Sequence, residues 1–494
     1  MSANNRQKFY IEKYGAVNDG KTINTRAIQD AIDEAHKSKG IVVFTKGIFL
    51  CGSLILKSDI DLVLEDSSVL LGSTDPDNYK SLDIKNIPFS PKTDDNSRLA
   101  LLIANDVKNI SISGNGIIDG HGRALALVID SLHCTGKKID PHYGSRPSET
   151  MRPKIINFIN CENIRITGIT IKNSSCWVQN YELCKNLVID SIKVISRAYW
   201  NNDGIDITDC TNVRITYCDI NSGDDGICLK SYYPGHFNDS FYIANCVIRS
   251  SCNAVKLGTA SIGGFRNITI ENNKIYDTGL SAIAIENVDG GFIENIIVNS
   301  ITAINTGNAL FVRLGHRSGE HPGTINNINI QNLNVQVPLG RPDLYYDMRV
   351  PEPHFSHNQF PVVIVGIPDQ FIEEIKLRNI EISYPGKASK GLAWLPLWRL
   401  NEIPEHLQDY PEYNMFGELP SWGFYIRHVK SIIMKNIILK LRDADFRPAM
   451  VLDDVENIDM QNITIPNDKT QQIILKNVKH NNLDSNIIPF SVRL

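Results

Sequence analysis

A short pattern, asparagine–apolar–any residue–apolar, recurs along most of the chain. The first apolar positions of its copies and looser variants are separated by 54, 23, 26, 28, 27, 28, 32, 47, 57 and 26 residues. We interpret 54 as two turns of 27, and the gaps of 47 and 57 as turns that carry insertions. A repeat unit of 23 to 32 residues favours a solenoid, in which each unit packs on its neighbours. These positions are Ile110, Ile164, Leu187, Val213, Phe241, Ile268, Ile296, Ile328, Ile375, Ile432 and Ile458.

Each repeat unit has the pattern of short β-strands. Apolar and polar residues alternate over a few positions, and Gly, Asn, Asp and Ser interrupt the alternation. Leucine-rich repeats have a similar unit length, but these units lack the leucine spacing of that fold. We therefore predict an all-β chain that forms a single parallel β-helix domain over residues 1–494. The asparagine before each strand fits a turn that other residues would strain, and stacked asparagines can hydrogen-bond along the ladder.

The N-terminal segment and two later segments depart from the repeat. Thr25 precedes apolar residues at helical spacing and Gly40 follows them, which predicts one short α-helix. We expect residues 10–60 to form an N-terminal cap and first coil, because a solenoid end otherwise exposes backbone edges. The long gaps predict loop insertions at 338–361 and 385–424 that shape a binding face. The aromatic residues of the second insertion either stack on sugar rings or pack within the loop. They are Trp394, Trp398, Tyr410, Tyr413, Phe416 and Trp422.

Composition excludes several classes of protein. The net charge is −5, from 50 basic and 55 acidic residues, so a nucleic-acid partner is not expected. No apolar run approaches the ~18 residues of a membrane span. The start, MSANNRQKFY, lacks the apolar core of a signal peptide. We expect a cytoplasmic protein, or a periplasmic or secreted one if the numbering begins after a removed signal peptide. The ten cysteines include no CxxC pair, which indicates buried free thiols and not a metal or redox motif.

A second strand of each unit places polar residues on one face. Five segments align with apolar residues at their second and fourth positions, which point inward, so the other positions point outward. Lys230, Lys256, Glu286 and Arg313 then lie on one outer face. The segments are GIDIT (204–208), GICLK (226–230), AVKLG (254–258), AIAIE (282–286) and ALFVR (309–313).

Three carboxylates, those of Asp203, Asp224 and Asp225, stand just before the first two of these strands. Stacking of adjacent coils would gather them on one outer face. Crowded carboxyls keep one member protonated while others stay ionised. Inverting glycoside hydrolysis needs one carboxyl of each kind, about 6.5–9.5 Å apart. Two other uses are a turn-forming role for Asp-Gly and a calcium site. The flanking Lys230 and Lys256 argue against calcium.

Two motifs carry a family resemblance. NNDGIDI at 201–207 and SGDDGICLKS at 222–231 resemble the paired acidic motifs of glycoside hydrolase family 28, the polygalacturonases. KYGAVNDGKTINTRAIQDAID at 13–33 resembles the N-terminal coil of pectin-degrading β-helix enzymes. The resemblance implies a right-handed parallel β-helix and hydrolysis with inversion, without metal or cofactor. It also implies that Asp224 is the general acid and that Asp203 and Asp225 activate the water.

The chain departs from the family at two positions. The family's Gly-His-Gly aligns with Cys252-Asn253-Ala254, and its Arg-x-Lys aligns with Ala284-Ile285-Glu286, where a glutamate would repel a uronate. We expect Lys256, Lys230 and Arg313 to supply positive charge instead. The predicted substrate-binding residues are Asn253, Lys256, Lys230, Glu286, Arg313 and, for ring stacking, Trp177.

These observations predict an inverting, exo-acting glycoside hydrolase of pectin-type oligo- or polysaccharides. One alternative is a hydrolase of the same fold that cleaves another pectic or algal linkage. A polysaccharide lyase would use calcium or a Lys/Arg base. A non-catalytic carbohydrate-binding solenoid would not need clustered acids. The oligomeric state is left open.

Overall fold

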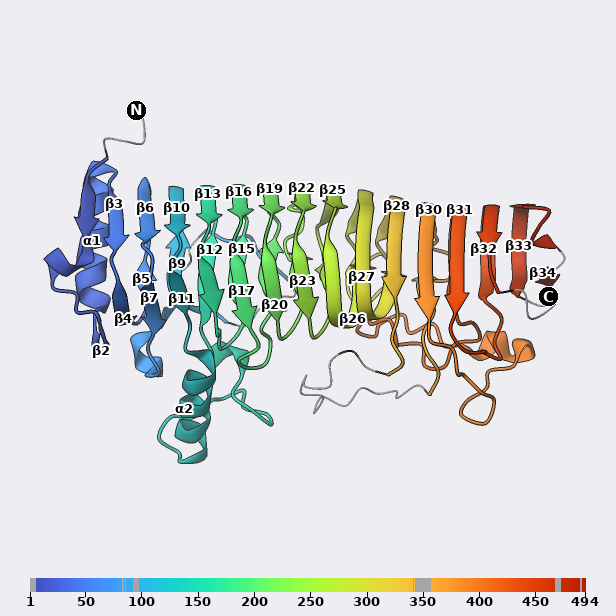
Figure 1. Cartoon of the computed structure of the whole chain (residues 1–494), viewed down its shortest axis with the longest axis horizontal. Helices are drawn as coiled ribbons and strands as arrows, with labels where there is room; N and C mark the ends of the chain where they lie inside the picture. The colour runs from blue at the N-terminus through green and yellow to red at the C-terminus, as the bar shows by residue number, and fades with distance from the viewer. Residues whose placement is uncertain are drawn as a thin grey trace. The chain divides into compact units, whose positions relative to one another are not determined.

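The computed structural model describes residues 6–81, 84, 86–91, 97–340, 342, 357–466, 472–488 and 491–494. The chain divides into two compact units, Met1–Tyr242 and Ile243–Leu494, called unit 1 and unit 2 below. Within each unit, parallel strands stack coil upon coil (Figure 1). The predicted all-β, right-handed parallel β-helix with a short N-terminal helix is confirmed, whereas the single-domain boundary stays a prediction. Among the helices of the described residues, none is long and apolar enough to cross a membrane.

Among its described residues, unit 1 contains three stacks of parallel strands; the first coil contributes strands to the first two stacks, and each later coil contributes one strand to each stack. The first stack is β1 (Lys8–Tyr10), β3 (Ile41–Phe44), β6 (Ile60–Leu64), β10 (Lys108–Gly114), β13 (Glu162–Thr167), β16 (Lys185–Asp190) and β19 (Thr211–Thr216). The second is β2 (Asp19–Ile23), β4 (Gly47–Cys51), β7 (Ser68–Gly72), β11 (Ile117–Asp119), β14 (Thr170–Lys172), β17 (Lys193–Ser196) and β20 (Asp219–Ser222). The third is β5 (Leu54–Ile55), β9 (Leu99–Asn105), β12 (Lys154–Ile159), β15 (Gln179–Glu182), β18 (Ile205–Thr208) and β21 (Ile227–Ser231). The short β8 (Lys80–Ser81) pairs with β9 in antiparallel fashion.

The strand register confirms the repeat and corrects one of its intervals. Ile164, Leu187 and Val213 stack in successive coils, and each is buried. Ile110 pairs directly with Ile164, so the interval of 54 residues is one coil with a long insertion and not two coils of 27. The insertion contains the helix α2 (Gly122–Cys134), which the sequence analysis did not predict.

The repeated asparagines occupy the second residue of the first-stack strands β10, β13, β16 and β19, one position inside the strands that they were predicted to precede. Asn109, Asn163, Asn186 and Asn212 have φ between 57° and 59°, the left-handed region that asparagine tolerates better than most residues. Each side-chain amide of the last three donates to the asparagine one coil earlier, at 2.9, 2.9 and 2.7 Å. Unit 2 has a similar ladder through Asn332, Asn379, Asn436 and Asn462.

Helix α1 (Thr25–Ser38) lies in the N-terminal segment, as predicted. It buries Ile28, Ala31, Ile32 and Ala35 on one face and is followed by Lys39, whose φ of 54° is left-handed. The remaining helices of unit 1 are the short 3-10 turns η2 (Ile11–Tyr14), η3 (Pro76–Asn78) and η4 (Glu149–Met151).

Unit 2 continues the same architecture with longer strands that bend through successive coil corners. The strand β22 (Asn238–Ala244) contains the boundary between the units. The strands of unit 2 are β23 (Val247–Ser250), β24 (Val255–Ser261), β25 (Gly264–Glu271), β26 (Lys274–Asn287), β27 (Phe292–Leu314), β28 (Thr324–Gln336), β29 (Val362–Val365), β30 (Ile372–Tyr384), β31 (Phe424–Leu441), β32 (Met450–Thr464), β33 (Ile473–Leu483) and β34 (Ser491–Arg493).

Residues 385–423, called the covering loop, connect β30 to β31 and include the 3-10 helix η5 (Leu397–Glu402). The loop buries an apolar cluster on the outer face of unit 2, where Phe416 and Met415 pack with Phe311 and Tyr425. Phe416 thus packs against strands as well as within the loop, whereas Trp394 and Trp398 are 52% and 80% exposed. The other predicted insertion, 338–361, lies largely outside the described residues.

Candidate active site

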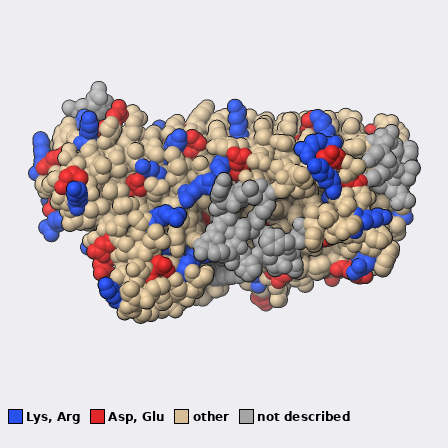
Figure 2. Space-filling view, turned by 60° about the horizontal axis from the view of Figure 1, so that its bottom comes forward, with Lys and Arg blue, Asp and Glu red and all other residues tan. Residues whose placement is uncertain are grey.

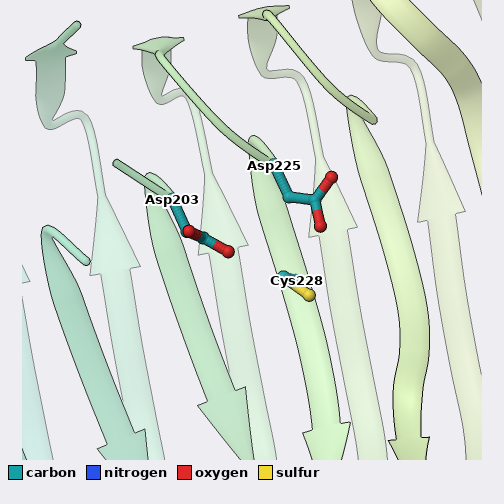
Figure 3. A group of neighbouring side chains, drawn as sticks. All are labelled: Asp203, Asp225 and Cys228. Atoms are coloured by element: carbon teal, nitrogen blue, oxygen red, sulfur yellow. The ribbon is translucent and has the colours of Figure 1, made fainter. Parts of the chain in front are cut away.

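Two adjacent coils of unit 1 bring Asp203 and Asp225 to the starts of β18 and β21 (Figure 3). Ile205 pairs with Ile227 and Ile207 with Leu229, so the predicted alignment of these two strands is confirmed. The Gly204 N–H donates to the Asp225 carbonyl at 2.9 Å, which fixes one turn directly against the next.

Gly204 explains why the first acidic motif contains an Asp-Gly pair. A Cβ atom at this position would lie 2.6 Å from the Gly226 carbonyl oxygen, closer than side chains approach backbone. The two turns can therefore stack at the spacing of one coil only if this residue is glycine. Gly204 therefore has a structural role, whereas its neighbour Asp203 belongs to the candidate active site.

A buried asparagine holds the turn that carries Asp203. The Oδ1 atom of Asn202 accepts hydrogen bonds from Ser196 Oγ (2.9 Å), Ala198 N (2.9 Å) and Tyr199 N (3.2 Å). Its amide nitrogen donates to the carbonyls of residues 174, 176 and 200, at 3.1, 3.0 and 3.4 Å. Asn202 is fully buried. The sequence analysis missed this residue, although it stands next to Asp203 in the quoted motif.

The three predicted catalytic carboxyls lie together. One carboxyl oxygen of Asp225 lies within 4.8 Å of one of Asp203, and the same limit holds between Asp225 and Asp224. Asp203 and Asp225 are each 4% exposed, whereas Asp224 is half-buried. The Asp225 N–H donates to Asp224 Oδ1 at 3.0 Å, and Ser222 Oγ donates to the Asp224 carbonyl at 2.8 Å. This gives a group of carboxyls with one member more open to solvent than the other two.

Lys230 and Asp206 add two more buried charges beside these acids. Lys230 Nζ lies 3.7 Å from Asp203 Oδ2 and 3.1 Å from Asp206 Oδ1. Burial, Asp206 and Asp224 raise the pKa of Asp203 well above its usual value, and Lys230 opposes this rise. Burial also raises the pKa of Asp206 to about 7, again against the effect of Lys230. The site therefore retains protons at a pH where isolated carboxyls have lost theirs.

The thiol of Cys228 lies beside these carboxyl groups. Cys228 Sγ lies within 4.8 Å of carboxyl oxygens of Asp203 and Asp225, a donor set that a metal ion could use (Figure 3). Lys230 Nζ donates to this sulfur at 2.9 Å, so an ammonium group already supplies positive charge at that point. We assign no metal site here, and the metal-free reaction stays a prediction.

Trp177 does not present its ring openly to solvent. It is 4% exposed, and the ammonium groups of Lys154 and Lys230 lie 4.9 and 4.6 Å from its ring centroid. These cation–π contacts stabilise two buried lysines. The predicted outward positions of this stack are correct in register, but Lys230 is only 5% exposed. Its role in contacting substrate stays a prediction.

The candidates of unit 2 form a second polar cluster, which we describe separately. Lys256 is 2% exposed, and its Nζ donates to the hydroxyl of Tyr410 on the covering loop at 3.2 Å. The same nitrogen lies 3.8 Å from Glu286 Oε2 and 3.7 Å from Glu412 Oε1. Glu286 also accepts from Thr259 Oγ1 at 2.9 Å. The predicted lysine and glutamate thus form an ion pair.

Arg313 and Asn253 lie inside the packing of unit 2. Arg313 is fully buried; it donates to the carbonyls of Gly366 (2.9 Å), Glu405 (2.7 Å) and His406 (3.0 Å), so it ties the covering loop to the coils. Arg313 aligns with Glu286 as predicted, but the covering loop buries it, and its role in substrate binding stays a prediction. Asn253 is also fully buried, and its Oδ1 accepts from the N–H of residue 281 at 3.0 Å.

Together, the fold and the carboxyl group define a class: parallel β-helix proteins with an acidic cluster at the start of two adjacent strands. Comparison with known sequences then gives the family. The chain belongs to glycoside hydrolase family 28, because residues 81–338, just over half of its 494 residues, match the model of Glycosyl hydrolases family 28.

Three relatives illustrate the similarity. A probable polygalacturonase of Vitis vinifera is 30% identical over 307 residues, which cover 58% of this chain and 59% of the relative. An exo-poly-alpha-D-galacturonosidase of Dickeya chrysanthemi is 27% identical over 383 residues, which cover 69% and 60%. The chain thus spans about six tenths of the length of both. The solved family 28 exopolygalacturonase of Yersinia enterocolitica has a TM-score of 0.68 at 18% identity, with 92% of this chain and 78% of that chain covered, and supports the fold.

Proposed function

We propose that this protein is an inverting glycoside hydrolase that removes sugars from the ends of pectin-type oligo- or polysaccharides. The observation that carries the proposal is the cluster of Asp203, Asp224 and Asp225 on two stacked turns. Asp224, the more solvent-exposed of the three, donates a proton to the leaving oxygen. Asp203 and Asp225 accept the proton of the attacking water. The names of the two sequence relatives support a galacturonide substrate, and one of them supports exo action.

Surface charge is compatible with a carbohydrate partner. Lys and Arg side chains are mixed with Asp and Glu on the face shown in Figure 2, and the whole chain has a net charge of −5. Such a surface gives little electrostatic attraction to nucleic acid.

A second candidate is the same reaction on a sugar without a carboxylate. The contact between Lys256 and Glu286 favours this candidate, because the glutamate stands where the family has a cation and neutralises the nearest lysine of unit 2. Under this reading neutral pectic or algal linkages are the substrates.

The decisive experiment incubates the protein with oligogalacturonides of defined length and with matched neutral oligosaccharides. Release of monosaccharide from galacturonides supports the first candidate, and release only from neutral chains supports the second. NMR of the first-formed product should show the anomeric configuration opposite to that of the substrate. Retention of configuration would refute inversion.

Variants link the activity to the carboxyl cluster. Asp224→Asn should lower the rate by roughly 10²- to 10⁴-fold while substrate binding is retained, because the general acid is lost. Asp219→Asn, on β20 of the same unit with a 48% exposed side chain, is the matched control and should keep full activity. An unchanged rate in Asp224→Asn would exclude this cluster from the chemistry and would favour a binding protein.

A further inference from the structure

Asp206 and Lys230 are buried charges to which the proposed reaction gives no part. Asp206 is fully buried on β18, three residues after Asp203, and it pairs in register with Cys228. Lys230 is 5% exposed on β21. Its ammonium group contacts three acidic groups: Asp206 at 3.1 Å, Asp203 at 3.7 Å and the Cys228 sulfur at 2.9 Å.

Burial makes these charges expensive unless each stabilises another. An isolated carboxylate in a protein interior takes up a proton instead of remaining charged. Here one ammonium group lies between two buried carboxyls, with its strongest ion-pair geometry toward Asp206. The carboxyl groups of Asp206 and Asp203 therefore compete for the ammonium group of Lys230.

Asp203 must be ionised to accept a proton from water, yet its neighbours oppose ionisation. The groups that face it are Asp206 on its own strand and Asp224, Asp225, Cys228 and Lys230 on the next turn and strand. Among these, Lys230 alone is cationic. On the far side, Lys154 of β12 acts on Asp206, and Tyr232 acts on Lys230.

We propose that Lys230 and Asp206 are positioning residues that set the ionisation of Asp203: Lys230 favours the carboxylate form of Asp203, and Asp206 anchors the ammonium group while limiting its effect. The proposal rests on the proposed function, since it assigns Asp203 to water activation. It goes beyond that function in naming two residues that act on the reaction through Asp203.

Removing the cation gives the first test. In Lys230→Met, the acid limb of the pH profile of kcat/KM should move upward by about one to three pH units. This range follows from Coulomb's law for charges 3.7 Å apart at an effective dielectric constant between about 80 and 20. Lys230→Arg, which keeps the charge, should move the limb by less than half as much. Lys193→Met, an exposed lysine on β17, is the matched control and should leave it unchanged.

Removing the competing carboxylate gives a shift of opposite sign. Asparagine is close in shape to aspartate. Asp206→Asn should therefore move the acid limb of the pH profile to lower pH, because Asp203 is then the remaining carboxyl group that pairs with the Lys230 ammonium group. The double variant Lys230→Met/Asp206→Asn removes one charge of each sign and should return the limb toward its native position. Upward shifts in both single variants, or no shift in either, would overturn the proposal.

Unfolding experiments test the same charges without substrate. Relative to the native protein, Lys230→Met should lose stability increasingly as pH rises from 4 to 9, because the buried carboxyls lose their cation. Asp206→Asn should gain stability over the same range. If these opposite trends hold and no sugar is hydrolysed, the proposed function fails and the electrostatic coupling stands. If substrate is hydrolysed and the trends are absent, the coupling fails alone.

Discussion

Replacing Asn202 by alanine should destabilise unit 1 more than any neighbouring exposed substitution. The side chain satisfies three buried carbonyls and three donors. Each lost hydrogen bond costs about 1 kcal/mol, and the buried partners left without it add desolvation cost. Water can enter the space of the lost amide and recover part of this. We therefore expect the free energy of unfolding to fall by about 3–5 kcal/mol.

The assay is urea unfolding followed by tryptophan fluorescence and far-UV circular dichroism, with kcat/KM measured on the folded fraction. Because Asn202 holds the turn before Asp203, we expect kcat/KM to fall by on the order of 10²-fold through misplacement of the carboxyl. Asn334→Ala, at an exposed position on β28, is the control and should change stability by less than about 0.5 kcal/mol. A loss below about 1 kcal/mol for Asn202→Ala would refute the view that this amide holds the turn.

Three further predictions concern other contacts. Gly204→Ala should lower the free energy of unfolding by about 2–4 kcal/mol in urea titration, because the added Cβ would lie 2.6 Å from the Gly226 carbonyl oxygen. An unchanged free energy of unfolding would show that the two coils can move apart to accept the methyl group. Burial raises the pKa of Asp206 and of Asp209 to about 7 in the folded protein, above the value in the unfolded chain. The protonated side chains therefore stabilise the folded state fully below about pH 4, and this stabilisation is lost as the pH rises through 7. The native protein should thus be about 5 kcal/mol less stable at pH 8 than at pH 5 in urea titration, and a gain on raising the pH would contradict this assignment. Glu405→Gln breaks the ion pair between the covering loop and Arg427, and should speed trypsin cleavage within 385–423 severalfold while cleavage elsewhere is unchanged.

The fold was predictable because its signals are local and repeated. Inward apolar positions recur in every coil, and a two-residue alternation assigns each side chain to a face without knowledge of distant contacts. For this reason the pairs Ile205–Ile227 and Ile283–Leu310 were aligned correctly from the sequence. The role of the repeated asparagines was also predictable from the sequence, because a left-handed backbone conformation restricts which residues can occupy that position.

The spacing between repeats gave a wrong number of coils where a coil with an insertion was as long as two ordinary coils. The 54-residue interval equals two average coils, so its number could not reveal the helix α2 inside it. Leu125, Ala126 and Ile129, which are buried at helical spacing, held the missed signal.

Burial of the outer face was not predictable from strand periodicity. Alternation separates inside from outside, but whether an outside position meets solvent depends on segments far away in the chain. Arg313 is covered by Glu405, His406 and Phe416, which lie about 90 to 100 positions later in the chain. The candidate acids were found because the aligned strands of two adjacent coils place them at equivalent positions, whereas the supporting amide of Asn202 required the three-dimensional arrangement of its partners.

The asparagine ladders have a consequence for how such a chain can change in length. Each turn asparagine needs only an equivalent amide one layer away, at about 2.7–2.9 Å in unit 1. Duplicating or deleting an entire layer would preserve every such pairing, whereas gaining or losing a few residues within a layer would interrupt it. Evolution is therefore free to alter this scaffold in whole steps, and smaller length changes are confined to the connecting segments outside the strands.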